Sequence, residues 1–134
     1  MNDLKLPNII KCHKMYKLLE EFHYENFCHP YSIKDYSKFN EAIAIFCDNY
    51  GILRPRRIRF RRTFHDLVTC QKRKNLIIGL TYASGNIDIL YPHSYWRGCR
   101  RWIGIVYHEL GHYVNPYATE REIFKFERKM LRRK

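Results

Sequence analysis

Two histidines, His108 and His112, stand four positions apart in the stretch HELGH. Residues at this spacing lie on one face of an α-helix, one turn apart, whereas on a strand they would stand about 13 Å apart. The apolar residues that precede the second histidine recur at helical spacing: Trp102, Ile103, Val106 and Leu110. The pattern predicts a helix over about residues 96–114, which Pro116 ends because the residue before a proline is pushed out of helical geometry.

The rest of the chain predicts a small α+β domain. Helical periodicity covers residues 9–27, 37–50 and 118–134, and residues 75–82 and 86–90 read as two strands joined by a turn at Gly85. Residues 54–64 alternate, so that one face of a strand is apolar and the other basic. The apolar face is Ile58, Phe60 and Phe64, and the basic face is Arg57, Arg59 and Arg61. We expect residues 1–134 to form a single domain with N-terminal helices, a short, mostly antiparallel sheet, the HELGH helix and a C-terminal helix.

The HELGH stretch has the residue types of a zinc site. Two imidazoles on one helical face can bind one zinc ion. Glu109 lies about 100° further round the helix, near enough to take a proton from a water molecule without binding the metal itself. The metal lowers the pKa of that water, and the carboxylate accepts its proton as the water attacks a carbonyl carbon. The residues predict one Zn²⁺ per chain at His108 and His112, with Glu109 as general base, and close packing would explain Gly111 inside the helix.

A catalytic zinc ion needs a third protein ligand, and Glu120, Glu122 and Glu127 are the candidates. If the two helices fold back at residues 115–117, position 112 faces position 120 and position 108 faces position 124. The metal then meets the last helix between positions 120 and 124, so Glu127 lies too far along.

The two remaining candidates differ in the face of the helix on which they lie. Glu120 shares the face of Ile123 and Phe124, which we expect to point inward. Glu122 stands three positions after Thr119, so the stretch TERE forms a candidate capping box in which Glu122 bonds the Thr119 amide. Glu120 is therefore the expected third ligand, and Glu122 is the alternative.

These motifs resemble those of the zincin metallopeptidases. HELGH followed by a helix with ERE resembles the glutamate-ligand (gluzincin) type, and TEREIFKFERKML is similar to a segment of the ImmA/IrrE-like peptidases. An arginine-rich strand and a hairpin before the helix resemble the layout of SprT-like proteases, which act on DNA-bound proteins. The motifs lie in the last third of the chain. The resemblance implies a small zinc-dependent endopeptidase in which His108, His112 and Glu120 hold zinc and Glu109 activates water.

The resemblance also implies that an edge strand pairs with an extended protein or peptide substrate. The best candidate for this edge is NIDIL, with Asn86, Ile87, Asp88 and Ile89 as substrate-binding residues. A tyrosine or histidine often stabilises the oxyanion in such sites. Four residues are open for that role: Tyr113, Tyr117, His93 and Tyr95.

The charge of the chain suits anionic partners. Lys and Arg number 25 and Asp and Glu 13, which gives +12. The densest cluster spans Arg54–Arg62, and it predicts either non-specific binding of nucleic acid or a solvated strand face. An alternative to the peptidase is therefore a basic protein, associated with nucleic acid or a partner, that has a zincin-like fold with structural zinc or none. The oligomeric state stays open.

Five scattered cysteines form no CxxC pair, which disfavours a disulfide framework and a cysteine-based zinc finger. The N-terminal stretch lacks the apolar core of a signal peptide, and no segment approaches the length of a membrane span. We therefore expect an intracellular protein, in the cytoplasm or associated with nucleic acid.

Overall fold

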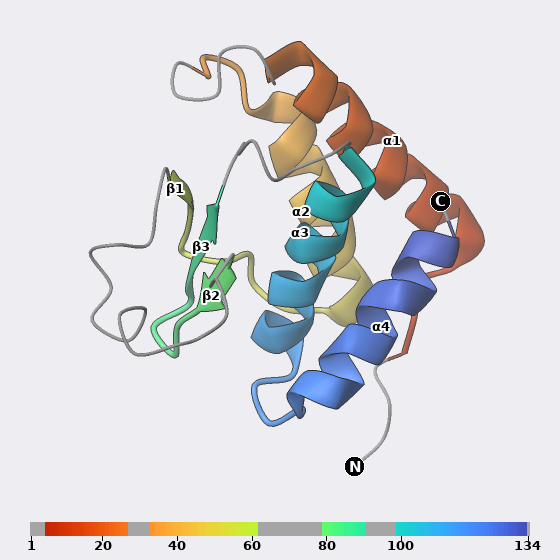
Figure 1. Ribbon diagram of the computed structural model, residues 1–134, viewed down its shortest axis with the longest axis vertical. Coiled ribbons are helices and arrows are strands. Elements are labelled where there is room, and N and C mark those ends of the chain that lie inside the picture. The colour runs from red at the N-terminus through yellow and green to blue at the C-terminus, as the bar shows by residue number, and fades with distance from the viewer. Residues whose placement is uncertain (1–4, 27–32, 62–78, 91–98, 134) are drawn as a thin grey trace.

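The structure of the chain, a computed structural model, describes residues 5–26, 33–61, 79–90 and 99–133. The described elements are α1 (Ile9–Asn26), α2 (Ser37–Tyr50), β1 (Arg57–Arg61), β2 (Gly79–Thr81), β3 (Asn86–Leu90), α3 (Cys99–Val114) and α4 (Glu120–Arg132). Figure 1 shows α3 between the sheet and α4, and α1 contacts both α3 and α2. The α+β expectation is confirmed, and the parts of the predicted elements that fall on residues 27, 62–64, 75–78, 96–98 and 134 lie outside the described residues.

The three described strands form one sheet in the order β1–β3–β2. β1 pairs with β3 in parallel, from Arg57 opposite Asn86, and β2 pairs with β3 antiparallel. The expected turn between β2 and β3 is present, with Gly85 at a φ of 89°. For the described strands the expectation of a mostly antiparallel sheet is wrong, because the hairpin pair β2–β3 is antiparallel and the longer β1–β3 pairing is parallel.

β3 is the central strand, so the expectation that it forms the substrate-binding edge is wrong. Its main chain pairs with β1 on one side and β2 on the other. The predicted substrate-binding positions Asn86, Ile87, Asp88 and Ile89 all lie within these pairings, and the last three are buried. A strand with both sides occupied has no main-chain groups left for a peptide.

The basic face of β1 is only partly open to solvent. Arg57 is exposed, but the side chain of Arg59 bonds the two carboxylate oxygens of Asp88 at 2.6 and 2.9 Å. Asp88 is completely buried and also accepts a hydrogen bond from the Tyr82 hydroxyl at 3.0 Å. Arg59 therefore neutralises a buried carboxylate within the sheet, as a buried charge requires.

The core is centred on α3, in which every residue from 102 to 111 is buried. Aromatic rings from α1, α2 and β1 surround Trp102, with ring centroids about 6 Å away: Phe22, Phe39 and Phe60. Such rings bury large apolar areas, and this packing holds the start of α3 in place. Among the described residues, no helix is both long and apolar enough to cross a membrane.

α4 lies close against α3 because α3 has glycines where the two helices meet. A Cβ on Gly111 would stand 3.0 Å from Cδ2 of Phe126, and one on Gly104 would stand 3.0 Å from Oε2 of Glu127. The expected close packing at Gly111 is confirmed. The inward face of α4 is Ile123, Phe126, Met130 and Leu131. The prediction that Phe124 faces inward is wrong, because 47% of this residue is exposed.

Candidate metal centre

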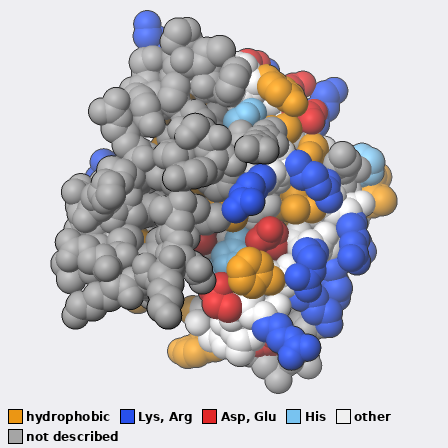
Figure 2. Space-filling model, viewed as in Figure 1, with side chains coloured by type: hydrophobic (Ala, Val, Ile, Leu, Met, Phe, Trp, Pro, Cys, Tyr) orange, Lys and Arg blue, Asp and Glu red, His pale blue; other side chains and the backbone are white. Residues whose placement is uncertain are grey.

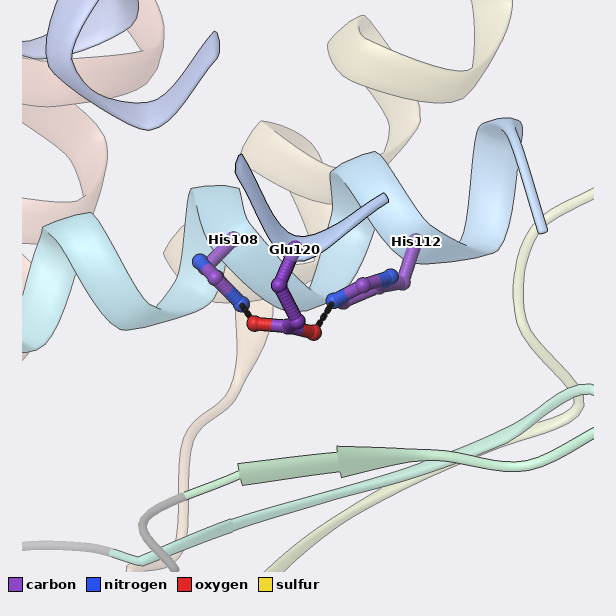
Figure 3. Close-up of side chains that lie close together, drawn as sticks. All are labelled: His108, His112 and Glu120. Atoms are coloured by element: carbon purple, nitrogen blue, oxygen red, sulfur yellow. Dashed lines mark hydrogen bonds and ion pairs between the residues drawn. The ribbon is translucent and has the colours of Figure 1, made fainter. Parts of the chain in front are cut away.

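His108, His112 and Glu120 come together at the side of α3 next to α4. One ligand atom from each lies within 4.8 Å of the other two, which makes a group that could hold a metal ion. Figure 3 shows both imidazoles leaving α3 on the same side and the carboxylate of Glu120 between them. Its oxygens lie 3.1 Å from Nε2 of His108 and 2.5 Å from Nε2 of His112. The structure thus brings together the three predicted ligands.

The predicted fold-back of the two helices explains this meeting. Position 112 faces position 120 through the pair of His112 and Glu120, as expected. Position 108 faces position 124, where the ring of Phe124 lies 4.6 Å from the imidazole of His108, centroid to centroid. Although partly exposed, Phe124 thus covers one side of this histidine and limits how its ring can turn.

The dimensions of the group fit a small metal ion. Zinc bonds to nitrogen and oxygen of 2.0–2.2 Å place tetrahedral ligand atoms about 3.3–3.6 Å apart, so the three donors need only modest movements to meet one ion. The side chain of Glu120 is 64% exposed and free to make them, whereas His108 is 8% and His112 21% exposed. Two fixed histidines and one adjustable carboxylate open to solvent suit a site with one ligand position left free.

Glu127 contributes a contact that the sequence reasoning missed. It was set aside as too distant for a metal ligand, yet its Oε1 lies 3.0 Å from Nδ1 of His108. A carboxylate on the second ring nitrogen fixes the tautomer and orientation of a metal-binding histidine and increases its basicity. The spacing in the sequence indicates this contact, because Glu127 follows Glu120 by seven positions and so lies on the same face of the helix.

The two histidines have opposite pKa shifts. Burial lowers the pKa of His108, but Glu127, Glu109 and Glu120 outweigh it, so that the pKa of this imidazole is raised. Burial also lowers the pKa of His112, and there the single carboxylate of Glu120 does not reverse the effect. The carboxylates therefore make His108 the more basic partner of the pair.

Glu109 lies beside the ligands, buried between α3 and β2. Its Oε1 accepts a hydrogen bond of 2.8 Å from the hydroxyl of Thr81, which also lies 3.0 Å from the Glu109 carbonyl oxygen. At Gly79, a Cβ would stand 2.6 Å from Oε2 of Glu109, so the carboxylate lies directly against the main chain of β2. Burial raises the pKa of Glu109 to about 7, and the bond from Thr81 only partly offsets this. Such a carboxyl group can take up and release a proton near neutral pH.

The capping box is present as predicted. The Thr119 side chain accepts from the Glu122 amide at 3.1 Å, and the Thr119 amide donates to the Glu122 carboxylate at 2.9 Å. This contact occupies the carboxylate of Glu122, which caps the start of α4 and does not join the histidines. Glu120 is the glutamate of the two that lies with His108 and His112.

No contact joins the metal group to Tyr113 or Tyr117, the two oxyanion candidates within the described residues. The hydroxyl of Tyr113 donates to the carbonyl of Leu53 at 2.7 Å, and Tyr117 is 88% exposed. His93 and Tyr95 lie outside the described residues.

Acidic and histidine side chains gather on one face of the molecule. Figure 2 shows red and pale-blue side chains next to one another in the middle of this face, while Lys and Arg line its outer side along α4. The concentration of carboxylates contrasts with the net charge of +12 and favours binding of a cation at this point.

The chain matches no known family model, no curated protein and no solved structure in the comparisons made.

Proposed function

We propose that the protein is a small zinc-dependent endopeptidase. The observation that carries this proposal is the convergence of His108, His112 and Glu120 beside the buried carboxylate of Glu109. Two imidazoles and a carboxylate are a ligand set that suits zinc. A zinc ion there would act as a Lewis acid on a peptide carbonyl and lower the pKa of a water molecule. The residues of the chain itself would then perform the proton transfers.

Glu109 is the proposed general base. Its carboxylate would accept a proton from the attacking water and pass it to the nitrogen of the departing peptide. The hydrogen bond from Thr81 and the close approach of Gly79 hold the carboxylate in one place, which a proton carrier needs. Glu127 would orient His108 and take no part in proton transfer to the substrate.

The substrate would lie along β2. Among the described residues β2 pairs only with β3, so its other side is the sheet edge next to α3. In Figure 3 the strands run past α3 on the side toward which the three ligand side chains point. An extended peptide that paired with β2 would pass close to Glu109, because Thr81 and Gly79 both contact it. Main-chain pairing of this kind gives affinity with little sequence preference.

The first test is metal content after purification without added zinc. We expect one zinc ion per chain in the wild type, loss of the ion in Glu120→Ala, and retention in Glu122→Ala. The second variant is the matched control, since it also removes a carboxylate from the first turn of α4. A wild type that stays metal-free after zinc is supplied would overturn the proposal.

The second test is hydrolysis of a mixed peptide library, read by mass spectrometry. Glu109→Gln preserves the shape of the side chain but removes the base, so cleavage should fall by about 10²–10⁴-fold while zinc content stays the same. If the zinc-loaded wild type cleaves nothing, or if Glu109→Gln cleaves equally well, the site is a metal site without peptidase activity.

A further inference from the structure

A pocket distant from the metal ligands in the fold lies between α2 and the segment that leads into β1. It has a volume of about 230 Å³, and no lining residue belongs to α3 or α4. Its apolar side includes Tyr36, which precedes α2, and Phe39 and Ile43 of that helix. Its other side carries three arginines: Arg54, Arg56 and Arg57.

These arginines are available to a ligand. All three are exposed, and none forms an ion pair with a described residue, in contrast to Arg59, which is held by Asp88. Of the residues that the structure describes, no acidic one lines the pocket. Two acids stand next to lining residues in the sequence: Asp35 accepts a hydrogen bond from the main-chain amide of Ser37, and Glu41 forms an ion pair with Lys14. The three arginines therefore make the rim of the pocket positive.

The apolar side of the pocket restricts which anion fits. Tyr36 is 39% exposed, and its ring is stacked on Phe60 at 9° between planes. A ligand that uses both sides of the pocket needs a flat, weakly polar group beside a negative charge. In a nucleotide the base is the flat group and the phosphate carries the charge. Proteins that bind single-stranded nucleic acids combine aromatic rings, which stack on the bases, with arginines, which contact the phosphates. An acidic peptide would satisfy only the arginines.

The size of the pocket favours one unit of a polymer. Sites that enclose a whole small molecule usually measure about 300–1,000 Å³, and this pocket is smaller. In a duplex the bases are stacked inside and only phosphates would reach the arginines. We propose that this pocket binds one nucleotide of a single-stranded nucleic acid, with the base against Tyr36 and the phosphates at Arg54 and Arg57.

The test is fluorescence anisotropy with a labelled thymidylate dodecamer, titrated with the full chain at several salt concentrations. Arg57→Gln should weaken binding and reduce the slope of log affinity against log salt by about 0.7, the value for one lost phosphate contact on a single strand. Tyr36→Leu should weaken binding about fivefold or more through the lost stacking. Arg128→Gln is the matched control, because Arg128 is an exposed arginine on α4 outside the pocket.

Several outcomes would overturn the assignment. Equal loss in Arg128→Gln, or equal affinity for a duplex or a polyglutamate peptide, would show attraction by overall charge alone. A mononucleotide that binds as tightly as the dodecamer would replace the strand by a free nucleotide as the ligand. If Tyr36→Leu fails to fold, the binding measured with Arg57→Gln still tests the proposal, because the Arg57 side chain is exposed and its replacement should leave the fold intact. Unchanged binding by His112→Ala is expected, which separates this pocket from the metal site.

Discussion

Glu127 should control how tightly the metal is held without binding the metal itself. Its carboxylate lies 3.0 Å from Nδ1 of His108, and the two side chains are 17% and 8% exposed. Replacing Glu127 by alanine removes the acceptor for the Nδ1 proton and leaves a mostly buried imidazole without that partner. We expect Glu127→Ala to retain the fold and the three ligands but to bind zinc more weakly.

Two independent estimates give the size of the effect. Losing a carboxylate behind a metal-binding histidine typically reduces metal affinity by about 10–100-fold, which corresponds to about 1.4–2.8 kcal/mol. A hydrogen bond to a charged group contributes about 1.5–3 kcal/mol, and low exposure means that solvent screens this one little. Because the Glu127–His108 pair is little exposed, we expect Glu127→Ala to weaken zinc binding by a factor near the upper end of the range of about 10–100-fold. Glu127→Gln retains an acceptor oxygen but loses the charge, so about tenfold is expected.

The assay is competition for zinc with a chromophoric chelator at fixed pH. Glu122→Ala serves as the control, because it deletes another α4 carboxylate and breaks only the capping box. That variant should lose about 0.3–1.5 kcal/mol in the free energy of unfolding at unchanged zinc affinity. If Glu127→Ala bound zinc as tightly as the wild type, or if Glu122→Ala weakened zinc binding equally, the role given to Glu127 would be refuted.

Three further substitutions test the packing around the site and the core. Gly111→Ala should lower the free energy of unfolding by about 1 kcal/mol in urea titrations, since the crowding of Phe126 at 3.0 Å outweighs the gain in helix propensity; a stabilised variant would contradict this. Gly79→Ala should leave zinc content unchanged but reduce peptide cleavage about a hundredfold, because a Cβ 2.6 Å from Oε2 must displace the buried Glu109; unchanged cleavage would show that this contact is unimportant. Burial lowers the pKa of His23 in the folded chain. Below about pH 6.5 the unfolded chain therefore binds a proton at His23 that the folded chain does not bind, and the free energy of unfolding falls as the pH falls. This contribution, at most about 1.4 kcal/mol per pH unit, should disappear in His23→Phe, as measured by unfolding at pH 5 and pH 7, and an identical pH dependence in both proteins would refute it.

The features that sequence predicted best are local ones. The spacing of His108 and His112, the stop at Pro116 and the capping box at Thr119 each depend on a few neighbouring residues. Together they fix two helices and the turn between them, and helix geometry then decides which positions face each other. The choice of Glu120 followed from that geometry.

The features that sequence did not predict depend on contacts between distant segments. Alternation along NIDIL indicated a strand, but it contains no information about which strands flank it, and β3 is central. The position of Asp88 in the core depends on Arg59 from a strand that is parallel and remote in sequence. Phe124 was assigned to the wrong side of α4 because Phe126, one turn before Met130, completes the inward face.

Glu127 lies between these two cases, and it shows how the metal group is assembled. Gly104 and Gly111 are seven positions apart on α3, as Glu120 and Glu127 are on α4. Gly104 lets α4 approach until Oε2 of Glu127 would stand 3.0 Å from a Cβ placed there. The proposed metal ligands and the carboxylate behind His108 thus come from one pair of adjacent helices.

The proposed general base is held differently, since Glu109 is fixed by Thr81 and Gly79 of the sheet. The proposed metal binding would therefore depend on contacts within one helix pair, whereas the orientation of Glu109 depends on a strand about thirty positions earlier in the chain. Changes in β2 should impair peptide cleavage while the metal stays bound. Changes at the α3–α4 contact should release the metal first, and cleavage would be lost only as a consequence.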